Sequence, residues 1–591
     1  MRPHLLLPVL LLLLTPRVEA AEPEFPLTAD SKPQPDVPKG GLIKDTYTSD
    51  KTIFPGTQRE YQIYIPNGLD RTKPAAFMVF QDGVIYQAPV VFDNLIAKSD
   101  IPPLVGVFIK PGVVPAANEN ALPRYNRSYE YDSITDNYSR FLIEEFLPAL
   151  EAKHGIKLST DPNDAAISGN SSGGIAAFMV AWHRPDRFRR VFTGVGTYVG
   201  IHGGDRLPVL VRKFEPKPIR IFLQSGTGDN NLYCGDWWMA NQMMERSFTW
   251  AGYDVNHAWG EGGHNGKHAT QIFPDVLRWL WKDWKTNKEI KANAKGESKW
   301  KGYEVCENDK SWRELQIQGL NCHALTPHRN GDVYFFESRS WKISYIESGT
   351  DAVRSFKEIA PLTGEFELGP MAFAPDGRLY TGFPNVLHGF GQEEVRRIVV
   401  ENVSPTGVCI AHNGKAYIAE FGVASLDLNT EEKHVKAQEM GIPTDAKMRM
   451  ASPSRLCLSP DQTLLYGSNL FDPSGCIYSW KLESDGSGSQ GQSFFKLEPP
   501  PIGNTEPGGL CVDTDGRLYV ATTLGIQVCD QAGRVNFIIS TPAIPHDVCF
   551  GGKNLSELFI ACGDKIYKRP TKVHGIVSGQ MPPIKPTAPK L

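Results

Sequence analysis

The second half of the chain repeats a short turn followed by an apolar strand that carries an aromatic residue. The aromatic positions are Tyr334, Tyr380, Tyr417, Tyr466, Tyr519 and Phe559, separated by steps of 46, 37, 49, 53 and 40 residues. A step of about 45 residues matches one four-stranded propeller blade, and the Asp-Gly or Asn-Gly pairs before the strands favour hairpin turns. A β-sandwich would need six similar hairpins by coincidence. The spacing therefore predicts a six-bladed β-propeller over residues 303–577.

The first half has a different pattern, in which strand-like and helix-like runs alternate. Alternation of this kind is typical of an α/β domain built around a largely parallel sheet, and we expect that domain over residues 40–285. The expected strands are 60–65, 76–80, 104–109, 165–168, 219–224 and 255–259, and the expected helices are 138–153, 174–183, 241–251 and 272–284.

Four further segments are expected to lie outside these two domains. Residues 1–20 have basic residues, an apolar run and Val18-Glu19-Ala20, which predicts a signal peptide cleaved after Ala20 and export to the periplasm or the cell exterior. Its apolar run of ten residues, Leu5–Leu14, is about half of the ~20 residues that a membrane anchor needs. We expect a proline-rich tether at 21–39, a lysine-rich solvated linker at 286–302 and a loose tail at 578–591.

Charge and cysteine content exclude several kinds of protein. The formal net charge of −4 lacks the basic footprint of a nucleic-acid binder. Nine of the ten cysteines follow residue 300 without any CxxC pair, and several stand inside apolar runs, as Cys457 and Cys511 do. This arrangement favours buried thiols over a dense disulfide framework and disfavours a structural zinc site. The sequence gives no indication of the oligomeric state or of a cofactor.

The most specific chemical motif is Gly169-Asn170-Ser171-Ser172-Gly173, which stands between a strand-like and a helix-like run. A G-x-S-x-G pentad in this context is a nucleophile elbow, a strained turn in which larger residues would collide with the flanking strand and helix. Ser171 is then the nucleophile, and the Ser172 amide at the helix N-terminus is one donor to the developing oxyanion. A small-residue turn that only packs a helix on a strand is the structural alternative.

A serine nucleophile needs a histidine base and a carboxylate that orients the histidine, in the chain order serine, acid, histidine. Asp229 ends the strand and glycine loop that begin at Phe222, and we choose it as the acid, with Asp236 as the alternative. His264 stands in the glycine-rich loop 260–264 and is our choice for the base. His257 is expected inside a strand, and His268 is expected one turn beyond the loop.

Two loops complete the predicted site. Gly83 follows the strand 76–80, where the second oxyanion donor of such a site belongs. Asp82 as a metal ligand is the competing idea, but no second carboxylate stands near it at ligand spacing, and we expect no metal. Arg127 and Glu130 are expected to form an ion pair that braces their loop, with direct contact to substrate as the alternative.

Residues 45–285 resemble the esterase family that includes enterochelin esterases, feruloyl esterases and S-formylglutathione hydrolase. The resemblance is carried by the strand 59–66, the loop 81–83, Arg127 with Glu130, the pentad 169–173, Gly226 to Asp229 and Gly262-Gly263-His264. It implies an α/β-hydrolase fold and a metal-independent carboxylesterase, with Ser171, Asp229 and His264 matching the family's triad. It does not fix the substrate.

Residues 303–570 resemble the gluconolactonase and regucalcin family of six-bladed propellers, most closely at 509–521 and 550–552. The resemblance implies an axial divalent cation held by Glu, Asn and Asp in members with lactonase activity. Here Gly508-Gly509 and Pro453-Ser454-Arg455 stand where an Asp-Gly pair and a Pro-Asn-Gly triplet are expected. Cations of this kind need oxygen ligands to replace their hydration shell, so a binding or scaffold role is favoured over an active lactonase.

Together these patterns predict an exported serine carboxylesterase fused to a propeller. An exported enzyme with a second domain resembles the secreted members of the esterase family that release acetyl or feruloyl groups from polysaccharide, so the resemblance favours an ester linked to carbohydrate as the substrate. The alternatives are a siderophore ester of the enterochelin type, a lactonase activity carried by the propeller, and a non-catalytic protein that binds carbohydrate.

Overall fold

The structure is a computed structural model that describes most of the chain. The described residues are 24–317, 322–338, 340–359, 369–383, 386–391, 397–401, 405–419, 423–429, 438–440, 455–469 and 474–589. The chain divides into two compact units, of which the first holds residues up to 205, 219–245 and 255–290 and the second holds 206–218, 246–254 and 291–591. The domain limits expected from the sequence stay predictions, and the expected signal peptide 1–20 lies outside the described residues.

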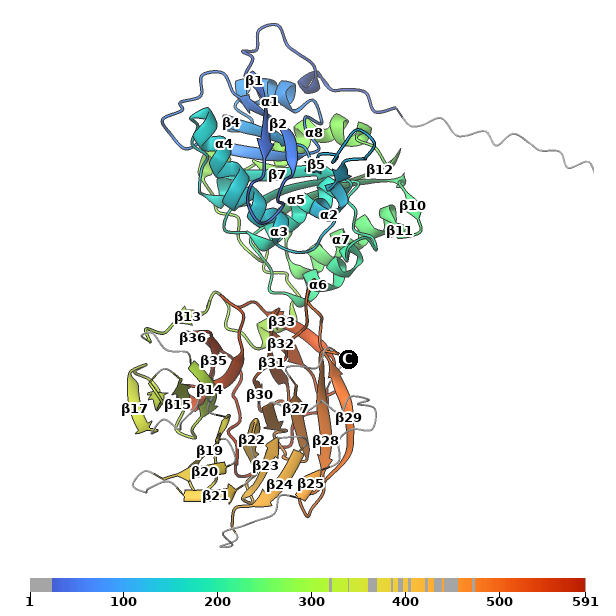
Figure 1. Cartoon of the computed structure of the whole chain (residues 1–591). Coiled ribbons are helices and arrows are strands. Elements are labelled where there is room, and N and C mark those ends of the chain that lie inside the picture. The colour runs from blue at the N-terminus through green and yellow to red at the C-terminus, as the bar shows by residue number, and fades with distance from the viewer. Residues whose placement is uncertain are drawn as a thin grey trace, which may run out of the picture. The chain divides into compact units, whose positions relative to one another are not determined.

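A ten-stranded mixed sheet forms the centre of the first unit (Figure 1). Its order is β12-β9-β8-β7-β3-β4-β2-β5-β6, and β1 pairs with β2. The strands β4, β3, β7, β8 and β9 run parallel to one another, whereas β2 pairs in antiparallel fashion with both β1 and β4. The bounds are β1 Gly41–Thr48, β2 Gln58–Ile65, β3 Ala76–Gln81, β4 Leu104–Ile109, β5 Val113–Val114, β6 Arg124–Tyr125, β7 Ala165–Asn170, β8 Arg190–Gly194, β9 Arg220–Gly228 and β12 Asp254–Gly263.

Helices cover this sheet on both faces. The helices α1 and α8 pack on one face, where Met78, Phe80 and Phe273 belong to one buried apolar cluster. The opposite face is covered by α5, against which α2 and α3 pack. The bounds are α1 Ala88–Ala97, α2 Arg127–Tyr131, α3 Asn137–Arg140, α4 Leu147–His154, α5 Ser172–His183, α7 Trp237–Ala251 and α8 Lys267–Leu280, with a π-helical turn at Phe141–Phe146 and a small hairpin of β10 Asn231–Leu232 and β11 Gly235–Asp236. The helix α6, Leu207–Lys213, and the end of α7 from residue 246 belong to the second unit. The predicted α/β fold is confirmed, and every strand and helix expected here overlaps one in the structure.

The proline-rich segment expected to be a loose tether is instead held against the first unit. Residues 24–39 include a short 3-10 turn at Ala29–Ser31, and Ser31 is buried. The Asp30 carboxylate binds Lys98 and Arg278, and the Phe25 ring stacks on His268 at 4.8 Å between centroids. Prolines stiffen the backbone, but these side-chain contacts decide where the segment lies.

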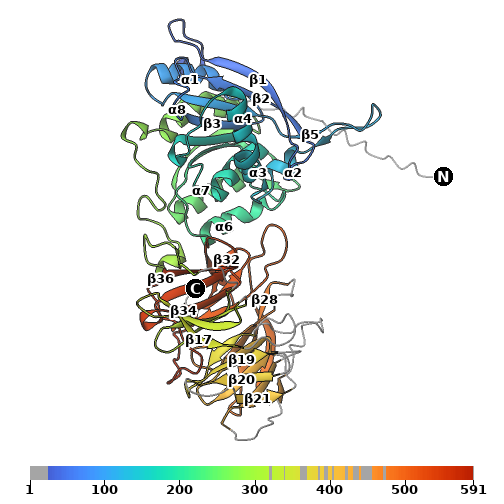
Figure 2. The same ribbon diagram turned by 60° about the vertical axis from the view of Figure 1, so that its left-hand side comes forward.

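Six four-stranded antiparallel sheets follow in the second unit (Figures 1 and 2). The predicted aromatics all lie in the second strand of their sheet, and Tyr334, Tyr380 and Phe559 are among the buried ones. The strands are β14 Cys322–Pro327, β15 Val333–Glu337, β16 Lys342–Ile346, β17 Val353–Glu358, β18 Met371–Phe373, β19 Leu379–Phe383, β20 Val386–Phe390, β21 Arg397–Glu401, β22 Gly407–Ile410, β23 Lys415–Ala419, β24 Val423–Asp427, β25 Gln438–Met440, β26 Arg455–Leu458, β27 Leu464–Ser468, β28 Cys476–Leu482, β29 Gly488–Lys496, β30 Leu510–Val512, β31 Leu518–Thr522, β32 Gly525–Cys529, β33 Val535–Ile539, β34 Asp547–Gly551, β35 Glu557–Cys562 and β36 Lys565–Pro570. The predicted six-bladed propeller is confirmed.

The ring closes through a strand contributed from before the first blade. The strand β13, Arg313–Glu314, pairs with β36, so the last sheet has the order β13-β36-β35-β34. The inner strands contact one another in sequence around the ring, and β34 contacts β14. The strand β13 is therefore the fourth strand of the last blade. Its pairing with β36 joins residues that are about 250 positions apart in the chain.

Residues of the linker that was expected to be solvated, and of the tail that was expected to be loose, are packed within the second unit. Trp300, in the expected linker 286–302, is buried in the same apolar cluster as Phe537. In the expected tail, the Ser578 hydroxyl accepts from the Ile410 amide and donates to the Ile410 carbonyl, each at 2.8 Å. A few apolar or hydrogen-bonding residues are enough to fix segments whose overall composition is polar or proline-rich.

Candidate active site

Ser171 occupies the turn between β7 and α5. Its backbone has φ 56° and ψ −123°, a strained conformation for a residue with a side chain. The Ser171 amide donates to the Gly194 carbonyl at 2.9 Å, and the Ser171 carbonyl accepts from the Gly174 amide at 2.9 Å. These bonds hold the strained residue at the carboxyl end of the central strand, where Ser171 lies half-buried.

The two outer positions of the pentad have no room for a side chain. A Cβ atom on Gly169 would lie 2.4 Å from the Gly173 carbonyl carbon, and one on Gly173 would lie 2.9 Å from the Gln81 Cβ. Real Cβ atoms essentially never approach other heavy atoms within 3.0 Å. The glycines of the motif are therefore required by the contact between strand and helix, as the sequence pattern predicts.

The structure brings together the three side chains that the sequence proposes as a triad. The Ser171 Oγ lies 2.8 Å from the His264 Nε2, and the His264 Nδ1 lies 2.6 Å from the Asp229 Oδ1. The Asp229 side chain is fully buried, and its carboxylate also accepts from the Asn230 amide at 2.8 Å and from the Ser225 hydroxyl at 2.6 Å. Full hydrogen bonding of this buried carboxylate holds it in place beside the imidazole.

The remaining candidates for acid and base lie elsewhere. The Asp236 carboxylate accepts from the Met239 amide and from the Asn231 side chain, so it orders the start of α7. His257 stacks on Trp259 at 4.6 Å between centroids. The His268 Nδ1 lies 3.2 Å from the Gln224 amide nitrogen, and burial lowers the pKa of this histidine. Of the described histidines and acids considered, His264 and Asp229 are the pair that reaches Ser171.

The two predicted oxyanion donors have different surroundings. Ser172 is the first residue of α5, and the first amides of a helix have no acceptor within it. Gly83 has φ 90°, but its amide donates to the Ile109 carbonyl at 3.2 Å. The assignment of the Gly83 amide as a donor to substrate is therefore corrected, because that hydrogen already serves the contact between two strand ends.

The predicted ion pair between Arg127 and Glu130 is wrong. Arg127 binds Asp82 through two parallel bonds, Nε to Oδ1 at 2.7 Å and Nη2 to Oδ2 at 2.8 Å. Glu130 instead binds Arg59, with both side chains fully buried. The two charges lie on one short helix but brace different neighbours: Arg127 reaches the loop after β3, and Glu130 reaches β2.

Asp132, a buried acid behind the elbow, was missed in the sequence, as was the contact of Arg127 with Ser172. The Arg127 Nη1 donates to the Ser172 hydroxyl at 3.0 Å, and the buried Asp132 accepts from Ser128 at 2.6 Å. Burial raises the pKa of Asp132, although hydrogen bonds from Ser128 and Ser172 act against that rise. A bidentate bond to Asp82 raises the pKa of Arg127. The Ser172 side chain is thus fixed between a guanidinium and a carboxyl group.

Thr197 and Trp237 were also missed, and both lie directly against the three residues. The Thr197 Oγ1 lies 3.2 Å from the Ser171 Oγ, and the Trp237 ring meets the His264 ring edge-on at 5.5 Å between centroids. Thr197 follows β8 and Trp237 begins α7. The carboxyl ends of neighbouring parallel strands meet at one edge of a sheet, which is the signal that could have pointed to the segment after β8.

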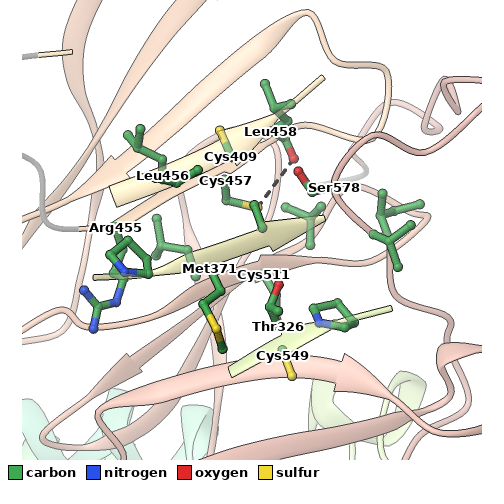
Figure 3. A pocket seen from close by; sticks show the side chains of 18 of the residues that line it. Thr326, Met371, Cys409, Arg455, Leu456, Cys457, Leu458, Cys511, Cys549 and Ser578 are labelled. Carbon is green, nitrogen blue, oxygen red and sulfur yellow. Dashed lines mark hydrogen bonds between the residues drawn. The ribbon is translucent and has the colours of Figure 1, made fainter. Parts of the chain in front are cut away.

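The propeller has a small cavity of about 100 Å³ among its inner strands (Figure 3). Four consecutive blades each contribute a cysteine to its wall, and the tail contributes Ser578. Among the residues that the structure describes, no three histidine, cysteine, aspartate or glutamate side chains come together to hold a metal ion. The cysteines are Cys409, Cys457, Cys511 and Cys549, and burial raises the pKa of each thiol.

Gly509, which stands where the resemblance implies an Asp-Gly pair, lies beside the carboxylate of Asp547. The Asp547 carboxylate accepts from the Leu325 and Val548 amides at 2.8 and 2.9 Å. A Cβ atom on Gly509 would lie 1.8 Å from the Asp547 Oδ1. A larger residue at Gly509 therefore has no room beside that carboxylate. Pro453 and Ser454, where the other ligand was expected to be lost, lie outside the described residues.

Within the ranges that the structure describes, the helices lack the length and apolarity of a membrane-spanning segment.

Comparisons with known proteins match each half of the chain separately. Residues 54–273 match the family model described as "Putative esterase", and residues 307–563 match the model described as "SMP-30/Gluconolactonase/LRE-like region". The chain therefore combines an esterase-family region with a gluconolactonase-like propeller, as expected from the sequence.

Individual relatives are similar to one half or the other. A gluconolactonase of Zymomonas mobilis subsp. mobilis is 25% identical over 225 residues, which cover 35% of this chain and 63% of that protein. An iron(III) enterobactin esterase of Dickeya dadantii is 30% identical over 152 residues, covering 23% and 33% respectively. A solved ferulic acid esterase is 18% identical, with a TM-score of 0.34, and covers 41% of this chain and 99% of its own. The chain thus spans less than two thirds of the length of these two curated relatives.

Proposed function

We propose that this chain, which joins an esterase-family region to a gluconolactonase-like propeller, is a serine carboxylesterase that uses Ser171, His264 and Asp229. The observation that carries the proposal is the continuous line of hydrogen bonds from the Ser171 Oγ to the His264 Nε2 at 2.8 Å and from the His264 Nδ1 to the Asp229 Oδ1 at 2.6 Å. A serine hydroxyl becomes an effective nucleophile when a neighbouring base removes its proton. The strained elbow, which presents that hydroxyl at the end of the sheet, is further support.

The proposed reaction has two halves. His264 takes the Ser171 proton as the Oγ attacks the ester carbonyl carbon, and then gives the proton to the leaving alcohol oxygen. The acyl-enzyme is hydrolysed by water, which His264 deprotonates in the same way, and the Ser171 oxygen leaves with the returned proton. Asp229 accepts from the Nδ1–H throughout and stabilises the imidazolium form of His264.

The oxyanion of the tetrahedral intermediate is stabilised by backbone amides in this proposal. Ser172 supplies the first amide, because it starts α5 and lies next to the nucleophile. Asp82 is our candidate for the second amide, since Gly83 in the same loop already donates to Ile109. Arg127, which holds the Asp82 carboxylate and the Ser172 hydroxyl, fixes both donors relative to each other.

The substrate that we favour is an acetyl or feruloyl ester of a polysaccharide, encountered after export. A catecholate siderophore ester is the second candidate, because the chain is 30% identical to an iron(III) enterobactin esterase over 152 residues. In either case the propeller is proposed to bind or position the substrate rather than to hydrolyse it.

The test compares the mature wild-type chain with Ser171→Ala on p-nitrophenyl acetate, acetylated xylan, feruloylated xylan and a catecholate ester. We expect turnover of the small ester to fall by at least about 10³-fold in Ser171→Ala, since a triad acts as a unit. Ser139→Ala is the matched control, because Ser139 is also buried and donates only to the Asp136 carbonyl in the bonds described. Equal turnover in wild type and Ser171→Ala would contradict the proposal, and the preferred natural ester would distinguish the two substrate classes.

A non-catalytic role predicts that a fluorophosphonate probe leaves folded wild-type protein unlabelled. A lactonase activity of the propeller is tested with Ser171→Ala, which removes the esterase contribution. We expect no hydrolysis of gluconolactone with added Ca²⁺, Mn²⁺ or Zn²⁺, and cation-dependent hydrolysis that a chelator removes would assign a second active site.

A further inference from the structure

The Ser171 hydroxyl has a second neighbour besides His264. The Thr197 Oγ1 lies 3.2 Å from the Ser171 Oγ, and Thr197 is only 1% exposed. The Thr197 amide also donates to the Ser171 carbonyl at 3.1 Å, so backbone and side chain of the same residue contact the nucleophile. A buried hydroxyl in this position forms a hydrogen bond with the Ser171 oxygen, whether or not that oxygen carries its proton.

The neighbouring indole decides the direction of the bond between the two hydroxyls. The Trp237 Nε1 lies 3.2 Å from the Thr197 Oγ1, and an indole N–H can only donate. Thr197 therefore accepts from Trp237, and its own single proton remains for Ser171. The Ser171 hydroxyl donates its hydrogen bond to the unprotonated His264 Nε2, because the His264 Nδ1–H already donates to the Asp229 carboxylate at 2.6 Å. The Ser171 Oγ must then accept from Thr197.

The result is one chain of bonds that all point in the same direction, from Trp237 through Thr197, Ser171 and His264 to Asp229. Such chains strengthen each member, because each donor is polarised by the bond it accepts. The surroundings of Trp237 hold the first donor in place: its amide donates to the Asn230 carbonyl at 2.9 Å, and its carbonyl accepts from the Asn241 side chain at 2.9 Å. Trp237 is 4% exposed.

We infer that Thr197 is a further catalytic residue of this site, oriented by Trp237, which donates a hydrogen bond to the Ser171 oxygen whenever that oxygen carries negative charge. The inference rests on the proposed esterase function. When His264 removes the Ser171 proton, the Oγ gains charge and the Thr197 bond becomes charge-assisted and stronger. In the second half of the reaction the same bond stabilises Oγ as it leaves the acyl carbon. In the acyl-enzyme the Oγ is an ester oxygen and a poorer acceptor. The Thr197 bond therefore stabilises the states in which Oγ carries negative charge more than it stabilises the acyl-enzyme.

The experiment uses the full mature chain with Thr197→Val, Thr197→Ser and Trp237→Phe. Thr197→Val keeps the shape and removes the hydroxyl, and a hydrogen bond to a charged group is worth about 10- to 100-fold in rate. We expect Thr197→Val to lower kcat on p-nitrophenyl acetate and the rate of fluorophosphonate labelling by that factor, with KM within about two-fold. Thr197→Ser restores most of the rate, and Trp237→Phe gives a smaller loss because Thr197 loses only its orientation.

The matched control is Thr193→Val. Thr193 is fully buried, and its hydroxyl accepts from Tyr198 at 3.1 Å without contacting Ser171 in the bonds described. Both valine variants lose a buried hydrogen bond, so both are expected to lower the melting temperature, but only Thr197→Val is expected to slow labelling of folded protein. If Thr197→Val does not fold, Trp237→Phe carries the same test through the labelling rate.

Two results are distinguishable. If wild type is neither labelled nor active, the proposed function fails and the inference about Thr197 fails with it. If wild type is active and folded Thr197→Val keeps the wild-type kcat and labelling rate, the inference is overturned while the triad stands.

Discussion

Arg127 and Glu130 lie three residues apart in one short helix, and yet their charges stabilise different parts of the first unit. Helical spacing alone places them on neighbouring positions, where an ion pair is possible. Each finds a better partner across the fold: Asp82 offers Arg127 a bidentate carboxylate, and Arg59 offers Glu130 a fully buried guanidinium. The tertiary partners win because an exposed pair within a helix stabilises by only a few tenths of a kcal/mol.

The buried pair is expected to be important for stability. Glu130→Gln leaves the Arg59 charge buried against the Phe141 ring, whose centroid lies 4.1 Å from the guanidinium carbon, with one bonding partner neutralised. We expect the free energy of unfolding to fall by about 3 kcal/mol, measured by urea denaturation. Glu60→Gln is the control, because Glu60 pairs with Lys110 in solvent and its loss is expected to change the free energy of unfolding much less. Equal effects of the two variants would show that burial does not set the strength of the pair.

The partly buried pair of Arg127 and Asp82 is expected to matter for turnover. Arg127→Met frees the Asp82 loop and the Ser172 hydroxyl, and we expect kcat on p-nitrophenyl acetate to fall about 10-fold, because a loosened oxyanion donor costs a comparable factor. Arg127→Lys is expected to recover little, since an ammonium cannot form the parallel bonds. Arg184→Met removes a similar fork to Asp186 and is the control. A raised KM with unchanged kcat would instead indicate that Arg127 contacts substrate.

At the level of elements, the strand–turn–helix at Ser171 tolerates no side chain at its glycines. We expect Gly169→Ala to lower the free energy of unfolding by about 3 kcal/mol, because its Cβ would meet the Gly173 backbone at 2.4 Å and neither side of that contact is flexible. Gly41→Ala is the control, since a Cβ there has nothing within 4 Å. Thermal unfolding followed by circular dichroism measures both, and a Gly169→Ala protein as stable as Gly41→Ala would contradict this account of the elbow.

The N-terminal segment gives a pH-dependent prediction. Burial acts to raise the pKa of Asp30, but hydrogen bonds from Lys98 and Arg278 outweigh it, and the pKa is lowered from the ordinary 3.8. A carboxyl group whose pKa is lower in the folded than in the unfolded state stabilises the protein at pH values above its ordinary pKa. This stabilisation is lost as the pH falls through the folded-state pKa. We expect wild type to exceed Asp30→Asn by about 1 kcal/mol at pH 7, with the difference shrinking below pH 3.8. A difference that is the same at pH 7 and pH 3 would show that the charge of Asp30 is not its cause.

At the level of the whole molecule, most of the thiols of the chain are buried, and the propeller holds nine of the ten cysteines. All ten cysteines are free, and seven of them are buried. We therefore expect a thiol reagent to modify quickly at most Cys234, Cys457 and Cys476 in the native protein and all ten thiols in denaturant. Burial raises the pKa of Cys457 to about 12, so this thiol is expected to be the slowest of the three. Fewer than ten thiols in denaturant without reductant would reveal disulfides and contradict the free-thiol prediction.

The sequence by itself determined the two folds and three residues of the proposed site. Period and turn chemistry are local properties, so the six blades follow from the spacing of Tyr334 to Phe559, and the α/β sheet follows from alternating runs. The elbow is equally local, because glycine at positions 169 and 173 avoids the clashes that a Cβ atom would make with adjacent elements. His264 and Asp229 were found because chain order and glycine loops mark the ends of neighbouring strands.

The tertiary structure alone decided the partners. Whether Arg127 binds Glu130 or Asp82, whether the Gly83 amide is free or donates to Ile109, and whether the segment at 24–39 is loose or fixed by Asp30 depend on groups far away in the chain. Thr197 and Trp237 belong to the same class, since no motif marks them. Thr197 contacts Ser171, and Trp237 contacts Thr197, only because the fold brings together the segments that carry these three residues. Local patterns determine elements because their causes lie within a few residues, whereas a hydrogen-bond partner is chosen by whatever the fold brings within about 3 Å.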